Sequence, residues 1–227
     1  MYLRLKKDRK VARIRRMIIT WYGQACFRIQ SGKTTIVIDP FDKSVGLTPP
    51  KGEAGVVLIT HDHKDHNNVK AIGGEPFVID GPGEYEKSGV KVTGVQSFHD
   101  DKKGSERGIN TMYVVTMEGI RVGHFGDLGQ FELTDQQKEA LGEIDILMVP
   151  VGGVFTIDGE RAASIVNSIA PKIVIPMHYK IPGLTIKLAN ADQFLKEFGY
   201  EGKAVEKFTI KKNDLPQERM EVIVMKI

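Results

Sequence analysis

The chain has 227 residues, of which 41% are apolar and 27% charged, and its formal net charge is +3. This length and composition predict one large globular domain of mixed type rather than two separate domains. The single cysteine, Cys26, excludes an internal disulfide and a structural zinc site built from thiolates. The sequence lacks an apolar run of about 18 residues and an apolar signal segment, so we expect a soluble, cytoplasmic protein with no membrane partner.

The first 16 residues form a basic extension, which contains eight Lys or Arg residues and one acidic residue. Residues 17–227 are consequently net acidic, and the positive charge of the chain originates in residues 1–16. One interpretation is a contact with nucleic acid or an anionic membrane surface. We favour a solvated extension, or a start codon assigned too early with Met17 as the true start, because a basic tail alone is weak evidence of binding.

Short strands separated by turns are expected in the first half of the chain. Apolar and β-branched residues bounded by turn residues indicate strands at 17–21, 25–30, 34–38, 55–59, 76–79 and 90–98. The segments between them are expected to form a connecting loop at 43–55, a short helix at 67–72, a turn at 81–86 and a mobile polar loop at 100–108. A sheet whose strands end in polar loops follows from this pattern.

Three of the six histidines lie in the segment 60–66, Thr-His-Asp-His-Lys-Asp-His, directly after the apolar strand at 55–59. If this segment is extended, His61 and His63 point to the same side because they are two residues apart. Asp65 and His66 follow where a helix could begin and turn the chain. A solvated loop can also contain His and Asp, but it does not need a buried strand before it. The segment therefore indicates half of a metal site.

The second half of the chain alternates strands and helices more regularly. We expect strands at 111–117, 120–125, 145–149, 172–175, 208–210 and 220–225, and helices at 134–141, 160–169 and 190–198. Single polar residues lie at strand ends, namely His99, Asp127 and His178. Because strands are followed by helices in both halves, we expect two similar half-sheets packed face to face.

These motifs together resemble the metallo-β-lactamase superfamily over residues 17–227. The resemblance is carried by His-x-His-x-Asp-His after a buried strand, the later His99, the Gly-Asp-x-Gly sequence around Asp127 and the Pro-Met-His-Tyr sequence around His178. Ile-Asp-Pro at 38–40 and Pro-Val-Gly-Gly at 150–153 are similar to the compact bacterial and archaeal metal-dependent hydrolases, which include the L-ascorbate-6-phosphate lactonase type. The fold implied by this resemblance is α/β, a four-layer αββα sandwich.

The same resemblance implies a site for two zinc ions, with Mn²⁺ or Fe²⁺ as alternative metals. The implied ligands of the first ion are His61, His63 and His99. Those of the second ion are Asp65, His66 and His178, with Asp127 bridging the two ions. A metal-bridging hydroxide is the implied nucleophile, and the implied catalytic residues are Asp65, Asp127 and His178.

Residues beside these ligands are expected to support them. Asp39 matches a strand-end aspartate of the family by position, and we expect it to hold a ligand histidine by its other ring nitrogen. His124, inside a predicted strand, is expected to pack or to support a ligand, whereas Asp62 and Lys64 should face away from the metals. The candidates for binding the substrate or an oxyanion are Thr156, Tyr179 and Lys180.

The expected activity is the hydrolysis of a small ester, lactone or phosphoester by the domain 17–227. His63 stands where flavin-linked di-iron relatives carry glutamate, which favours zinc hydrolysis over oxygen reduction. One alternative is a phosphodiesterase or nuclease that uses residues 1–16 as a nucleic-acid contact. A second is a non-catalytic metal-binding regulatory protein on the same fold. A homo-oligomer is compatible with each of these functions.

Overall fold

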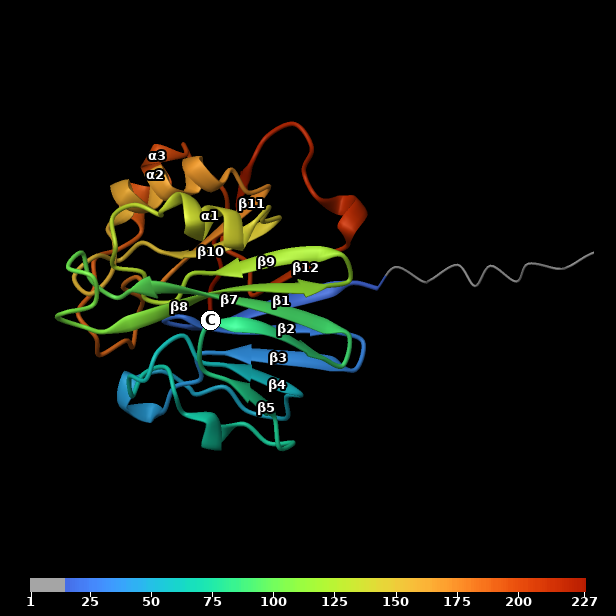
Figure 1. The fold of residues 1–227 in the computed structure, drawn as a ribbon. Helices are drawn as coiled ribbons and strands as arrows, with labels where there is room; N and C mark the ends of the chain where they lie inside the picture. The colour runs from blue at the N-terminus through green and yellow to red at the C-terminus, as the bar shows by residue number, and fades with distance from the viewer. Residues whose placement is uncertain (1–14) are drawn as a thin grey trace, which may run out of the picture.

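Two mixed β-sheets pack face to face in the computed structural model, which describes residues 15–227 (Figure 1). The basic segment that the sequence indicated at residues 1–16 lies outside the described residues, except for its last two. None of the helices within residues 15–227 is long and apolar enough to cross a membrane.

The first sheet contains six strands in the order β12-β1-β2-β3-β4-β5. Their bounds are β1 Met17–Gly23, β2 Cys26–Ser31, β3 Thr34–Ile38, β4 Val56–Leu58, β5 Phe77–Ile79 and β12 Lys207–Ile210. Strands β12, β1, β2 and β3 pair antiparallel, whereas β3, β4 and β5 pair parallel. The parallel strand β4 is buried along its whole length, as expected for a strand covered on both faces.

The second sheet contains seven strands in the order β13-β11-β10-β9-β8-β7-β6. Their bounds are β6 Gly83–Lys87, β7 Val90–Phe98, β8 Ile109–Met117, β9 Ile120–His124, β10 Ile146–Pro150, β11 Ile173–Met177 and β13 Glu221–Val222. The expected turn at 81–86 is wrong in part, because Gly83–Lys87 forms an edge strand that pairs antiparallel with β7. Its side chains are mostly exposed, so no apolar alternation indicated a strand.

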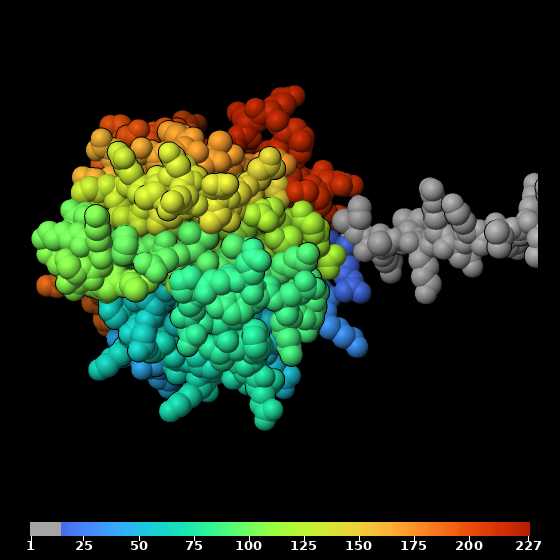
Figure 2. All heavy atoms as spheres, in the orientation of Figure 1, coloured from blue at the N-terminus to red at the C-terminus, as the bar shows by residue number. Residues whose placement is uncertain are grey.

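Three α-helices cover the outer face of the second sheet (Figure 1), and their segments form a continuous layer of yellow and orange in Figure 2. They are α1 Asp135–Leu141, α2 Gly159–Ile169 and α3 Asp192–Glu197. Thr134 and Gln137 form a capping box at the start of α1, and Asp158 caps α2 by accepting a hydrogen bond from the backbone N–H of Arg161. Helices α1 and α2 agree with those expected at 134–141 and 160–169.

The outer face of the first sheet is covered by loops and short 3-10 turns. Val45 of η1 (Lys43–Val45) and Ile72 pack against Cys26, Val37 and Val57 in a small hydrophobic cluster. The helix expected at 67–72 is only the 3-10 turn η2, Val69–Ala71, because the backbone N–H of Asn68 is bonded to the Pro40 carbonyl at 2.8 Å. The fourth layer of the sandwich is therefore thin here, while the main core lies between the two sheets.

The polar loop 100–108 is organised by one buried carboxylate. Asp100 accepts hydrogen bonds from four backbone N–H groups, those of Lys102, Gly104, Glu106 and Arg107. The loop that was expected to be mobile from its composition therefore has an internal partner for each of these donors. It brings Glu106 and Arg107 to the edge of the sandwich where the candidate site lies.

Candidate metal centre

All seven candidate ligands lie in loops that follow strands of the two sheets. Residues 60–66 follow β4 of the first sheet, while the second sheet contributes His99 after β7, Asp127 after β9 and His178 after β11. Strands β4 and β11 are apolar and buried throughout, whereas β7 and β9 also contain polar residues. The two sheets therefore end in one cluster of imidazoles and carboxylates, as the sequence pattern predicted for strand ends in α/β folds.

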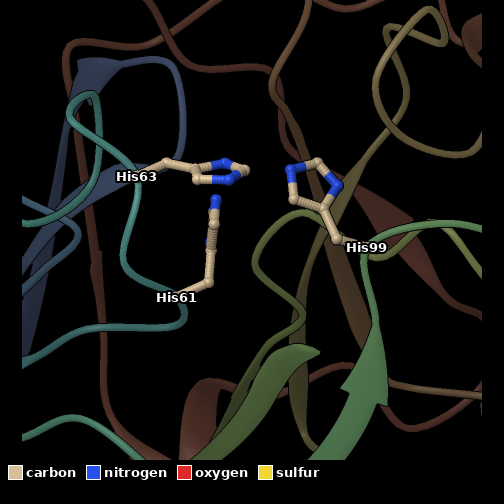
Figure 3. Close-up of side chains that lie close together, drawn as sticks. All are labelled: His61, His63 and His99. Atoms are coloured by element: carbon tan, nitrogen blue, oxygen red, sulfur yellow. The ribbon is translucent and has the colours of Figure 1, made fainter. Parts of the chain in front are cut away.

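His61, His63 and His99 form the part of the cluster shown in Figure 3, where their rings face one another. The ring centroids of His61 lie 4.5 Å from His63 and 4.7 Å from His99, and those of His63 and His99 are 5.2 Å apart. One ring nitrogen of each lies within 4.8 Å of the others. His61 and His99 are buried and His63 is exposed, so this trio reaches from the interior to solvent.

Asp127 lies at the centre of the remaining ligands. Its Oδ2 atom is 3.1 Å from Nε2 of His178, 3.3 Å from that of His99 and 3.4 Å from that of His66. The backbone N–H of Asp127 donates to the Asn110 side chain at 3.0 Å, which fixes the turn after β9. Ligand-forming atoms also converge in two further groups, His61 with His66 and Asp127, and Asp65 with His66 and His178. One carboxylate thus contacts histidines from both halves of the fold.

Several buried polar atoms of this cluster have no hydrogen-bond partner among the described residues. They are Gln24 Oε1, His61 Nε2, His66 Nε2, His99 Nδ1, Asp127 Oδ1 and His178 Nδ1. A buried polar atom without a partner costs about 1–3 kcal/mol, so a group of them in one place requires an explanation. Metal coordination supplies one for His61 Nε2 and His66 Nε2, which face Asp127, because imidazole nitrogens are donors that zinc and similar ions take in proteins.

Asp39 orients this cluster from behind. Its Oδ1 accepts a hydrogen bond from the backbone N–H of Thr60 at 2.8 Å, and its Oδ2 accepts one from the Thr60 hydroxyl at 2.7 Å. The same Oδ2 lies 3.0 Å from Nδ1 of His66, which leaves Nε2 of that ring to face the cluster. Thr60 in turn contacts Nδ1 of His61 at 3.0 Å. Asp39 therefore fixes the ring orientation of one histidine directly and of a second through Thr60.

Burial and neighbouring charges shift the pKa values of the cluster in different directions. Burial lowers the pKa of His61 to about 2, so its imidazole is neutral at physiological pH. Burial alone would raise the pKa of Asp127, but the imidazoles of His178 and His66 outweigh it and hold that pKa well below its usual range. For His66, burial is outweighed by the carboxylates of Asp127 and Asp39, which raise its pKa. The two carboxylates thus favour the protonated form of this ring, and a cation bound beside them would favour the neutral form.

The cluster opens into a cavity of about 480 Å³. Its lining includes Gln24, Val45, Lys64, Asp65, Arg107, Asp127, Phe155 and His178. Tyr179 is instead buried in the core with its hydroxyl donating to the Met225 carbonyl, and Lys180 is exposed outside the lining. Thr156 lines a smaller neighbouring cavity of about 190 Å³ that also contacts His99 and Arg107. Of the three residues proposed from the sequence for substrate binding, only Thr156 therefore lies near the site.

His124 supports the fold beneath the cluster and does not enter it. Its Nε2–H donates to the Ala25 carbonyl at 2.8 Å, while Nδ1 accepts a hydrogen bond from the backbone N–H of Gly126 at 3.2 Å. Both ring nitrogens are thus engaged in a neutral imidazole, whose pKa burial lowers. The ring also packs edge-on against Phe27, at 5.8 Å between centroids.

Sequence reasoning missed several residues that line the cavity, among them Gln24, Lys64 and Arg107. Gln24 lies in the two-residue turn between β1 and β2, Lys64 faces the cavity although alternation placed it outward, and Arg107 is presented by the Asp100 loop. Lys64 differs from the expectation because residues 60–66 are bent rather than extended, so alternation does not apply. For Arg107, the signal was Asp100 in front of a glycine-containing polar loop, a pattern suited to a carboxylate that caps backbone N–H groups.

Comparison with known proteins agrees with this architecture. The family model described as a beta-lactamase superfamily domain matches residues 18–178. A metal-dependent hydrolase from Nitratidesulfovibrio vulgaris is 32% identical over 71% of this chain and 79% of its own length. One from Thermococcus onnurineus is 29% identical, with coverages of 82% and 94%.

A solved structure from Thermotoga maritima, described as a Zn-dependent hydrolase of the metallo-beta-lactamase superfamily, aligns with a TM-score of 0.75 at 39% identity. The alignment covers 92% of this chain and 98% of that protein. The sequence and fold similarities lead to one assignment. The chain belongs to the metallo-β-lactamase superfamily and is a metal-dependent hydrolase of that family.

Proposed function

We propose that this protein hydrolyses a small ester, lactone or phosphoester with two zinc ions. The observation that carries the proposal is the convergence of three overlapping ligand groups beside a cavity of about 480 Å³. Cavities of this size bind small molecules and bury most of their surface. Mn²⁺ or Fe²⁺ would suit the same mixture of imidazole and carboxylate donors.

The ligands divide into two sets in this proposal. His61, His63 and His99 hold the first ion, and Asp65, His66 and His178 hold the second. Asp127 bridges them, which is supported by the short distances from its Oδ2 to His99 of the first set and to His66 and His178 of the second. Asp39 holds His66 in the ring orientation that the second ion requires.

Two such ions, when bound, lower the pKa of a coordinated water to roughly 7 and polarise a carbonyl or phosphoryl oxygen. The residues of the chain orient the ions, and a carboxylate beside them can accept a proton. Burial raises the pKa of Asp65, but its contact with His66 outweighs burial and lowers that pKa below its usual value. With 27% of its side chain exposed, Asp65 is ionised at neutral pH and presents its carboxylate to the cavity.

The cavity walls favour a substrate with an anionic group and an apolar portion. Lys64 and Arg107 supply cationic groups, while Val45, Phe155 and Ile186 supply apolar surface. The Arg107 guanidinium lies over the Phe155 ring at 5.6 Å and donates to the Val154 carbonyl at 3.4 Å. Within residues 15–227 it forms no ion pair. Its remaining N–H donors are therefore available to a phosphate or carboxylate on the substrate.

A metal analysis and a substrate panel test this proposal together. Protein purified without chelator should contain about two metal ions per chain and hydrolyse at least one class among esters, lactones and phosphoesters. His61→Ala and Asp127→Ala should each lose metal and at least 100-fold in kcat/KM, whereas Asp62→Asn, an exposed neighbour in the same segment, should retain both. A chain that stays metal-free in excess zinc would refute the site. Two bound ions without turnover would instead support a regulatory metal-binding protein.

A further inference from the structure

Gln24 is a buried polar residue at the metal cluster with an unusual backbone. It lies in the turn between β1 and β2, is 1% exposed and has a φ angle of 52°. Few non-glycine residues adopt this left-handed conformation, and where they do the surrounding structure holds them in it. Here the Gln24 carbonyl accepts hydrogen bonds from the backbone N–H of His178 at 3.1 Å and from the Trp21 indole at 3.0 Å. The turn is therefore fixed directly to the end of β11.

The side chain of Gln24 enters the space shared by the second set of ligands. Its Nε2 atom lies 3.1 Å from Asp65 Oδ2 and 2.8 Å from His178 Nε2. For comparison, Asp65 Oδ2 is 3.3 Å from His66 Nε2, a distance between two atoms of the proposed ligand set. Atoms that share one ion at about 2.0–2.2 Å are separated by similar distances. The end of the Gln24 carboxamide thus occupies a position equivalent to those of the ligands themselves.

The carboxamide of Gln24 has one end that lacks a partner. Oε1 is buried without a hydrogen-bond partner among the described residues, while Nε2 faces the two ligand atoms. A half-turn about the last side-chain bond exchanges oxygen and nitrogen with little change in shape. Leaving one end of the carboxamide without a hydrogen bond costs a similar free energy in either orientation. The orientation of the carboxamide therefore depends on whether Asp65 and His178 hold a cation between them.

A cation between Asp65 and His178 reverses the preference of the carboxamide. An NH₂ group directed at a cation is repelled by it, whereas an amide oxygen directs its lone pairs toward the cation. We propose that Oε1 of Gln24 is an additional ligand of the second metal ion, together with Asp65, His66 and His178. This inference rests on the proposed two-metal site and extends it to a residue outside the histidine and aspartate motifs.

An added amide oxygen makes the two metal positions chemically different. The first set consists of three imidazoles, whereas the second contains the oxygens of Asp65 and Gln24 beside two imidazoles. Oxygen donors favour harder ions such as Mn²⁺, while imidazoles suit Zn²⁺ equally or better. The second position should consequently bind Mn²⁺ more tightly than the first.

Titration of the chelator-stripped full-length protein with Co²⁺ tests the inference without any substrate. Visible absorption reports the coordination of each ion, and competition with a chromophoric chelator gives both affinities. Gln24→Leu should weaken the affinity for the second ion about tenfold or more and change the absorption spectrum of that ion. The affinity for the first ion should not change. Gln24→Glu restores an oxygen donor and should bind the second ion at least as tightly as the wild type. Gln30→Leu, at the opposite end of β2, is the matched control and should behave as the wild type.

The outcomes separate this inference from the function on which it rests. If the wild type binds two ions and Gln24→Leu binds the second with unchanged affinity and spectrum, Gln24 is not a ligand and the two-metal proposal stands. If the wild type binds fewer than two ions, both fail. Because leucine in a left-handed turn could unfold the chain, circular dichroism accompanies each titration, and Gln24→Asn provides a second test. Asparagine tolerates the left-handed conformation, and its side chain is one methylene shorter. It should therefore also weaken the affinity for the second ion.

Discussion

Asp100 allows a prediction whose magnitude follows from counted hydrogen bonds. The residue is 2% exposed, and its two carboxylate oxygens divide the donors of the loop equally. Oδ1 accepts from the backbone N–H groups of Lys102 at 2.8 Å and Gly104 at 2.7 Å, and Oδ2 accepts from those of Glu106 at 2.9 Å and Arg107 at 2.8 Å. In Asp100→Asn one oxygen becomes an NH₂ group, so two backbone donors lose their acceptor and face another donor.

The loss in Asp100→Asn should lower the free energy of unfolding by about 3 kcal/mol, at roughly 1.5 kcal/mol for each hydrogen bond to a charged group. Asp100→Ala should cost more, but less than twice as much, because the loop can open and bond to water. Urea unfolding at neutral pH measures both values. Asp101→Asn is the control, since its carboxylate is exposed and forms no hydrogen bond within residues 15–227. An Asp100→Asn variant within about 0.5 kcal/mol of this control would refute the reasoning.

The pH dependence of the same variant gives an independent check. Burial alone would raise the pKa of Asp100, but the four backbone donors outweigh it and lower that pKa to about 2 from the ordinary 3.8. A carboxyl group whose pKa is lower in the folded state contributes stability above its unfolded pKa and loses it as the pH falls toward its folded pKa. The difference between wild type and Asp100→Asn should therefore be full above pH 4 and decrease between pH 4 and 2. A difference that stays constant through this window would contradict the assignment.

Three further predictions concern metal and substrate. Asp39→Asn should weaken metal affinity about tenfold or more in chelator competition, because His66 loses its charged partner. Arg107→Ala should raise KM about tenfold for esters that carry a phosphate or carboxylate, by loss of a charge-assisted hydrogen bond, in steady-state assays. The control is Arg161→Ala, because the Arg161 guanidinium stacks on Phe131 outside the main cavity. This variant should leave KM unchanged. Removal of metal by chelation should lower Tm by about 10 °C in a thermal scan, since each ion at 100-fold excess over its Kd adds about 2.7 kcal/mol.

The strands of the sandwich could be predicted because their burial leaves a clear pattern in the sequence. Strand β1 alternates strictly between buried and half-buried residues, and β4 and β11 are wholly buried and apolar. Strand β6 escaped prediction because it depends on pairing with β7 while its side chains stay in solvent. The segment 67–72 could not form an α-helix since long-range contacts with the end of β3 determine its backbone, and no local pattern records such contacts.

The candidate ligands were accessible to sequence reasoning for a similar reason. Each follows the end of a strand, so the position of a single His or Asp is informative. Gln24 and Arg107 lacked such a context. Gln24 reaches the cluster only because its turn meets the end of β11, 154 residues later in the chain. Arg107 reaches it through the hydrogen bonds of Asp100. Both placements depend on tertiary contacts, which neither composition nor spacing encodes.

Three residues at the cluster have a strained backbone conformation. Among residues 15–227, nine non-glycine residues have a positive φ, and Gln24, Asp39 and His178 are three of them, at 52°, 49° and 51°. A left-handed conformation costs such residues about 1–2 kcal/mol each. The three follow β1, β3 and β11, and each directs its side chain at the cluster or at a histidine of it. Glycine would relieve this strain at each position but would remove the side chain, so the strain persists where the cluster needs the turn and the side chain together.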